Sequence, residues 1–389
     1  MAKIMWLSDS PFTCTGFATI SSNILNGLTD LGHECYYQGH NYVGQNIPYV
    51  KFEDGRELKF TTMGTGKEPY SKDLLVPRIR ELKPDFFGVL LDTFMLYPWY
   101  MQLDYAPAKT IFYYPSDGEG GLPLRCDGIL RKCNVPVAMS KFAQKQAHDL
   151  YNINSHYIPH AIDTSVYKPL TNSQRLLIKQ KWNLHDKFVV GSVYRNQGRK
   201  MPDRMFKAFA KFAKNHQDVV LFCHSDPYDG AAVFDSMELV KRLGIQNRVI
   251  WSGMSFYKGF NYEDMNEIYN LMDVFFLSTS GEGFGVPTIE AAGAGIPSVV
   301  TDFTTTQELL MDDGQCGIPV PIVTDLTGSW NVERGVMDID KAAEALEVLY
   351  NDKRLRQTLG RRGVEKVKKN YTWNTVIKQW DGLIKKCQM

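Results

Sequence analysis

Paired cysteines and clustered metal ligands are both lacking in this sequence of 389 residues. Its seven cysteines are scattered without a C-x-x-C pair, and their odd number argues against a disulfide framework and a zinc site. The eight histidines do not combine with carboxylates at the spacing of a metal site. We therefore expect chemistry that needs neither a bound metal nor another cofactor.

Long apolar runs and an excess of charge of either sign are also missing. No run approaches the roughly 18 residues of a membrane span, and residues 1–9 turn polar too soon for a signal peptide. Lys and Arg number 44 against 43 Asp and Glu, so charge does not indicate nucleic acid as a constant partner. We expect a cytoplasmic protein, and peripheral attachment at a membrane stays open.

The length exceeds what one hydrophobic core usually serves and predicts two domains. Buried strands are predicted at residues 4–8, 86–91, 110–114 and 135–139, and again at 188–193 and 273–278, with helical stretches between them. Repeated strand–helix units of this kind indicate parallel sheets covered by helices. A polar connector at residues 170–186 places the boundary between residues 1–168 and residues 169–371.

A glycine-rich junction follows the strand predicted at residues 273–278. Gly281, Gly283 and Gly285 let the backbone approach a ligand closely, and the N-terminus of the next helix attracts phosphate. Glu282 lies in this loop, and Glu290 lies about one turn inside the helix, where it can accept hydrogen bonds from paired hydroxyls such as those of a ribose. The alternative is an ordinary loop whose glycines only make the turn.

A basic turn follows the strand predicted at residues 188–193. Arg195, Arg199 and Lys200 form a compact positive site that suits a diphosphate, because arginine offers a bidentate fork and lysine a point charge. The alternative is a solvated basic turn.

Two candidates come from the first domain. Asp117 stands beside glycine at a strand end, where it could bind sugar hydroxyls or accept a proton, or only cap its own turn. Gly16 opens the first helix and could meet a phosphate or a sugar, or the site could be a plain cap made by Thr15.

The junction has a recognisable pattern. Glu-Gly-Phe-Gly-Val-Pro from Glu282, with Glu-Ala-Ala-Gly-Ala-Gly-Ile-Pro from Glu290, resembles the E-x7-E signature of retaining glycosyltransferase family 4. Arg-Asn-Gln-x-Arg-Lys from Arg195 resembles the donor-phosphate element of that family. The resemblance implies the GT-B fold, an α/β architecture of two Rossmann-like domains whose parallel sheets face a central cleft. It also implies that a last helix, residues 372–389, crosses back to the first domain.

The resemblance implies roles for single residues. Glu282 and Asp117 would be catalytic, and Glu290 would bind the ribose. The phosphates of the donor would be bound by Arg195, Arg199, Lys200, Gly16, Gly283, Phe284, Gly285 and Val286. The implied reaction moves a hexose from a UDP- or GDP-sugar to an acceptor hydroxyl with retention and without a metal.

The acceptor is not identified by the sequence. A glycan, lipid, protein, small molecule or modified nucleic-acid base would each fit the fold. We expect its contacts in the hairpin around Asp54 and in residues 118–125. Two other functions stay open, namely a nucleotide-sugar epimerase or hydrolase of the same fold and a catalytically inactive nucleotide-sugar-binding protein.

Overall fold

The computed structural model describes residues 1–13, 15–53, 55–68, 71–97, 99–120, 127–253 and 262–388. The chain divides into two compact units. The first holds Met1–Ser116, Gly120–Ala161 and Trp373–Met389, and the second holds Asp117–Glu119 and Ile162–Thr372. Asp54 and residues 121–125, named above for acceptor contacts, lie outside the described residues.

The first unit is built on a parallel sheet. Its seven strands lie in the order β5 (Thr61–Met63), β2 (Glu34–His40), β1 (Lys3–Asp9), β6 (Phe86–Val89), β7 (Lys109–Tyr114), β8 (Val135–Ala138) and β9 (His156–Tyr157). Its helices are α1 (Gly16–Asp30), α2 (Lys72–Leu82), α3 (Thr93–Leu96), α4 (Asp127–Lys132), α5 (Lys141–Tyr151) and α13 (Trp373–Gln388). A short antiparallel hairpin, β3 (Val50–Lys51) with β4 (Glu57–Leu58), forms where a hairpin was predicted.

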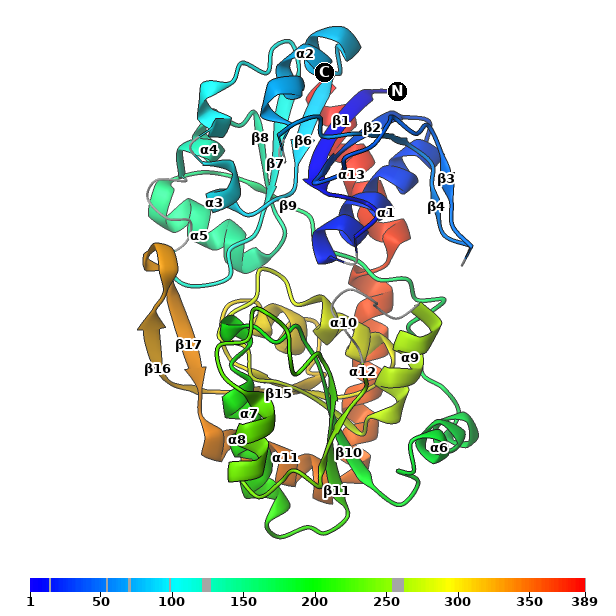
Figure 1. The fold of residues 1–389 in the computed structure, drawn as a ribbon, viewed down its shortest axis with the longest axis vertical. Helices are drawn as coiled ribbons and strands as arrows, with labels where there is room; N and C mark the ends of the chain where they lie inside the picture. The colour runs from blue at the N-terminus through cyan, green and yellow to red at the C-terminus, as the bar shows by residue number, and fades with distance from the viewer. Residues whose placement is uncertain are drawn as a thin grey trace. The chain divides into compact units, whose positions relative to one another are not determined.

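Alternation along β1 sends side chains into a core on each face of this sheet. Met5 and Leu7 are fully buried in a cluster with residues of α2 to α5. Trp6 points the other way, where its indole N–H donates to Ser21 Oγ of α1 at 3.0 Å. Its ring meets Trp380 of α13 edge to face at 5.6 Å, so α1 and α13 share this side (Figure 1).

The second unit has a six-stranded parallel sheet. The order is β12 (Val249–Trp251), β11 (Val219–His224), β10 (Phe188–Val193), β13 (Val274–Leu277), β14 (Ser298–Thr301) and β15 (Gly317–Val320). Its α-helices are α6 (Asn172–Lys181), α7 (Pro202–Ala213), α8 (Ser236–Arg242), α9 (Tyr262–Leu271), α10 (Val286–Gly293), α11 (Ile339–Asn351) and α12 (Lys353–Asn370). Helices α7, α8 and α11 cover one face, and α9, α10 and α12 cover the other (Figure 1). The α/β fold class predicted from the sequence is confirmed.

The strand order of this sheet fixes the place of a ligand site. From β10 the chain adds β11 and β12 on one side, and from β13 it adds β14 and β15 on the other. The loops after β10 and β13 therefore diverge at their carboxyl ends, and such a switch point is where open α/β sheets bind ligands.

An antiparallel hairpin that was not predicted from the sequence completes the second unit. Its strands are β16 (Ile322–Thr327) and β17 (Glu333–Met337). The backbones of Glu119 and Glu333 exchange hydrogen bonds of 3.1 and 3.0 Å. These bonds explain why residues 117–119, inside the range expected for the first domain, group with the second unit.

Short turns of other helical types connect these elements. The 3-10 turns are η1 (Trp99–Gln102), η2 (Gly198–Lys200) and η4 (Ser329–Asn331), and η3 (Gln307–Met311) is a π-turn. Across the described part of the chain, no helix combines the length and the apolar character that a membrane crossing requires.

Candidate active site

The loops after β10 and β13 are joined by hydrogen bonds at the switch point. The backbone N–H of Ser280 donates to the carbonyl of Arg199 at 2.8 Å, and the Ser280 hydroxyl donates to the same oxygen at 2.8 Å. Ser278 donates to the carbonyl of Met201, also at 2.8 Å. The basic turn and the glycine-rich junction, which the sequence separates by about 80 positions, thus form one structure.

Two glycines of the junction are required by its geometry. Gly281 has a φ of +150°, and a Cβ atom there would lie 2.1 Å from the carbonyl oxygen of Asp117. Gly285 has a φ of +103° and stands at the N-cap of α10. A side chain at either position would strain the backbone or displace residue 117. Helix α10 begins with Val286 and Pro287, and the N–H of Thr288 donates to the carbonyl of Gly285 at 3.0 Å.

Glu282 lies at the centre of a buried charge cluster. Lys200 Nζ donates to Glu282 Oε1, and Arg199 Nη1 donates to Glu282 Oε2 at 3.0 Å. The backbone N–H of Glu282 donates to Thr304 Oγ1 at 3.0 Å. The side chains of Glu282 and Lys200 are only 11% and 10% exposed, so this ion pair is largely removed from water.

The electrostatics of the cluster keep Glu282 ionised. Burial by itself would raise the pKa of Glu282, but the positive charges of Arg199 and Lys200 outweigh it and lower the pKa to about 2. Since the unfolded carboxyl has a pKa of 4.5, the pair contributes stability above pH 4.5. That contribution is lost as the pH falls from 4.5 toward 2.

Asp117 also belongs to this charge cluster, and it lies in the segment Asp117–Glu119, which groups with the second unit. Its carboxylate lies 3.4 Å from Arg199 Nε and 3.0 Å from Arg334 Nη2. Arg334 also donates to the carbonyl oxygen of Asp117. Arg334 belongs to β17, so the unpredicted hairpin supplies the second of the two guanidinium groups that hold Asp117.

Arg195 is held at the neighbouring strand end. Its Nε atom lies 3.0 Å from Asp229 Oδ2, and the Asp229 side chain is only 4% exposed. Burial raises the pKa of Asp229, but the hydrogen bonds from Arg195 and from the backbone of Ala231, together with the charge of Arg195, outweigh it, so the net shift is downward. Arg195 is therefore fixed by a buried carboxylate at the carboxyl end of the sheet.

Glu290 has a different environment on α10. Tyr269 of α9 donates its hydroxyl to Glu290 Oε2 at 2.6 Å. Burial raises the pKa of Glu290 from 4.5 to about 7, although hydrogen bonds from Tyr269 and Tyr167 act in the opposite direction. Glu282 and Glu290, eight positions apart, thus have pKa values on opposite sides of the ordinary value.

The structure joins four of the predicted residues in one chain of ion pairs, which runs from Asp117 through Arg199 and Glu282 to Lys200. Arg195 and Glu290 lie in the same unit with partners of their own, and residues 283–286 lead into α10. Gly16 belongs to the first unit, where Thr15 Oγ1 accepts the N–H of Ala18 at 3.2 Å. The cap considered as the alternative at Gly16 is therefore present.

Three partners in the site were missed by the sequence reasoning: Asp229, Thr304 and Arg334. Asp229 had a usable signal, because it follows the apolar run of β11, whose carboxyl end lies at the same sheet edge as Arg195. Arg334 had no such signal in the sequence, since the residue that it contacts, Asp117, is 217 positions away. Within the described residues, no three His, Cys, Asp or Glu side chains gather as a metal site would require.

Comparisons with solved structures define the class of fold. Sucrose-phosphate synthase of Thermosynechococcus elongatus superposes with a TM-score of 0.77 at 16% identity, covering 100% of this chain and 99% of that one. HepE of Anabaena, solved in complex with UDP-glucose, gives 0.73 at 15% identity and covers 99% and 100%. The chain has the GT-B fold of glycosyltransferases.

The family follows from the sequence of the second unit. Residues 174–366 match the model of glycosyl transferases group 1, so this part of the chain, which lies in the second unit, belongs to that family. Mannosylfructose-phosphate synthase of Agrobacterium fabrum is 27% identical over 183 residues, which are 44% of this chain and 38% of the relative. The match to this curated relative thus spans less than half of its length. The family resemblance found in the sequence is confirmed.

Proposed function

We propose that this protein is a retaining glycosyltransferase that moves a hexose from a UDP- or GDP-sugar to an acceptor hydroxyl without a metal ion. The observation that carries the proposal is the cluster of Arg199, Lys200 and Glu282 at the switch point, directly before α10. It combines cations for a diphosphate with a carboxylate for a sugar. The HepE structure with UDP-glucose supports a nucleoside-diphosphate sugar as the donor.

The diphosphate is the leaving group of this reaction, and its negative charge grows as the bond to the sugar breaks. Lys200 and Arg195 stabilise that charge, together with the N–H groups of residues 283–286 at the N-terminus of α10. In other enzymes a metal ion does this electrostatic work. Because these groups are already held in place, little reorganisation accompanies the reaction.

Glu282 acts on the sugar side of the same bond. In the free protein it neutralises Lys200, and a bound diphosphate would take over as the partner of the lysine. The carboxylate then accepts hydrogen bonds from sugar hydroxyls and stabilises positive charge near the anomeric carbon. Asp117, fixed by Arg199 and Arg334, contributes a second carboxylate to this region. Neither is assigned as a covalent nucleophile.

Product analysis tests the proposal. The protein is incubated with UDP- and GDP-hexoses and a panel of acceptor alcohols, and release of nucleoside diphosphate and the configuration of the new linkage are measured. Transfer with retained anomeric configuration is expected. Interconversion of sugars without nucleotide release would instead identify an epimerase, and sugar release to water alone would identify a hydrolase.

Replacing Arg334 by alanine is expected to lower the turnover number about 10-fold while the donor Kd changes little. The reason is that Asp117 loses one of its two cationic partners and its fixed position, a loss of roughly 1.4 kcal/mol in the transition state. Steady-state kinetics measure the split between kcat and KM. Arg334→Lys keeps one charge and should recover part of the rate, whereas Arg354→Ala, at an exposed position of α12, should change nothing.

Donor binding is expected to tighten as the pH rises through about 7, where Glu290 loses its proton. The ionised carboxylate accepts ribose hydroxyls, whereas the protonated one does so poorly. Between pH 4.5 and about 7 the folded free protein holds a proton that the unfolded chain has released, so its free energy of unfolding falls as the pH rises. Calorimetric titration measures the Kd of the nucleoside diphosphate at each pH. In the Glu290→Gln variant this Kd should no longer fall as the pH rises through about 7.

A further inference from the structure

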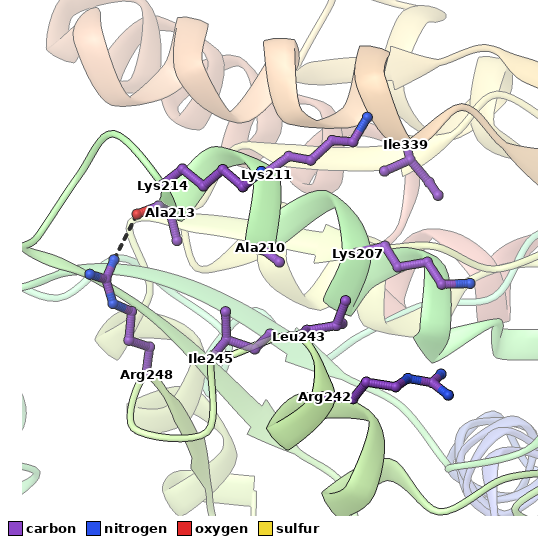
Figure 2. Close-up of a pocket in the computed structure, with 11 residues that line it drawn as sticks. Lys207, Ala210, Lys211, Ala213, Lys214, Arg242, Leu243, Ile245, Arg248 and Ile339 are labelled. Carbon is purple, nitrogen blue, oxygen red and sulfur yellow. Dashed lines mark hydrogen bonds between the residues drawn. The ribbon is translucent and has the colours of Figure 1, made fainter.

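A second cavity lies in the same unit among residues that the candidate active site does not use. It has a volume of about 540 Å³ and is lined by the second half of α7, the end of α8, residues 243–248 and Ile339 of α11 (Figure 2). A cavity of this size is sufficient for a small molecule or a lipid headgroup.

Positive side chains line this pocket from two facing walls. Lys207, Lys211 and Lys214 follow one another at spacings of four and three along α7, which places them on one face of the helix. Arg242 and Arg248 add two guanidinium groups from the opposite wall. Figure 2 shows Lys207 and Arg242 directed to one end of the pocket and Arg248 to the other. In a chain with a net charge of +1 this is a local concentration of cations.

Part of this charge serves the fold itself. Lys207 pairs with Asp203 at 2.9 Å, and Lys211 pairs with Asp340. Arg248 donates to the carbonyl of Ala213 at 2.8 Å and so satisfies the end of α7. Lys214 and Arg242 differ, because they are exposed and form no ion pair with any residue in the described parts of the chain.

The floor of the pocket is apolar. Ala210, Ala213, Leu243, Ile245 and Ile339 line it, and Ile245 and Ala213 are nearly fully buried. Cations at the rim above an apolar floor suit a ligand that is anionic at one end and carries a ring or an alkyl body at the other.

We propose that this pocket binds a phosphate-bearing ligand, with the phosphate at the end to which Arg242 and Lys207 point and the remainder on the apolar floor toward Lys214 (Figure 2). Arginine and lysine together are the side chains that bind phosphate most strongly in proteins. The phosphate belongs either to a free small molecule or to a lipid headgroup, and both share this chemistry. The site is independent of the proposed glycosyl transfer.

Binding of two probes to the full chain tests the pocket. Sodium tripolyphosphate is titrated by calorimetry at low ionic strength, and vesicles of phosphatidylcholine with or without phosphatidylglycerol are used in co-sedimentation. Tripolyphosphate is expected to bind two classes of site, one in this pocket and one in the candidate active site, where we propose that a diphosphate binds. The double variant Lys214→Glu with Arg242→Glu should weaken one class at least about 10-fold and leave the other.

The matched control reverses the charge of two cations at the start of α12, just beyond the C-terminal end of α11. Lys353→Glu with Arg354→Glu changes the net charge equally at exposed positions of α12 and should keep full binding of both probes. Selective loss of tripolyphosphate binding in the pocket variant supports a free phosphate ligand, and selective loss of binding to anionic vesicles supports a headgroup. Absence of binding to both probes, or equal losses in the two variants, would overturn the proposal. Because all four side chains are exposed, circular dichroism should show folded protein throughout.

Discussion

Replacing Glu282 by glutamine is expected to lower the turnover number of glycosyl transfer at least about 100-fold. The amide keeps the shape of the side chain but removes the negative charge that faces the developing positive charge on the sugar. The donor Kd should change much less, because the proposed contacts of the diphosphate are Lys200, Arg195 and the N-terminus of α10. Turnover at saturating donor is the quantity to measure.

The matched control for this variant is Glu267→Gln. Glu267 also pairs with a lysine in the second unit, since Lys181 Nζ lies 2.9 Å from its carboxylate, but the two side chains are 61% and 42% exposed. Its loss should leave both rate and stability unchanged. A Glu282→Gln protein that turns over at the rate of this control would remove Glu282 from the mechanism.

Lys200→Met is expected to have two large effects. It should weaken donor binding about 100-fold, because the cation nearest to the leaving diphosphate is gone. It should also reduce the free energy of unfolding by about 3–5 kcal/mol, since Glu282 stays buried without its closest partner. Urea unfolding and donor titration measure the two effects separately, and Lys181→Met at the exposed pair should show neither.

The double variant Lys200→Met with Glu282→Gln separates structure from function. It removes both charges, so most of the lost stability should return relative to Lys200→Met alone. Activity should not return, because neither the diphosphate nor the sugar regains its contact. Recovery of activity along with stability would mean that the pair only supports the fold.

Local patterns were enough to predict most elements around the site. The buried runs that became β10 and β13 and the glycine-rich start of α10 are each visible within about a dozen residues. Burial of a parallel sheet on both faces produces such runs, and glycine at a positive φ is demanded by the turn itself. These elements and their order could therefore be read without the structure.

Contacts between distant segments could not be predicted in the same way. The hairpin of β16 and β17 has a short and largely exposed first strand, so it lacks the alternation that marks a strand in sequence. Without this hairpin the sequence does not show that Arg334 contacts Asp117 or where either residue lies in the site. The raised pKa of Glu290 likewise depends on burial against α9, a property of packing and not of the residues beside it.

The most direct test of a nucleoside-diphosphate-sugar site is thermal unfolding with a panel of UDP, GDP, ADP and TDP and their hexose derivatives. A ligand that binds only the folded state stabilises it by RT ln(1 + [L]/Kd) and so raises the Tm. Wild-type protein should respond to one nucleotide and its sugar, and the Lys200→Met, Glu282→Gln double variant should lose that response while remaining folded. Absence of a shift with every ligand, or an equal shift in the double variant, would contradict the assignment of the donor site.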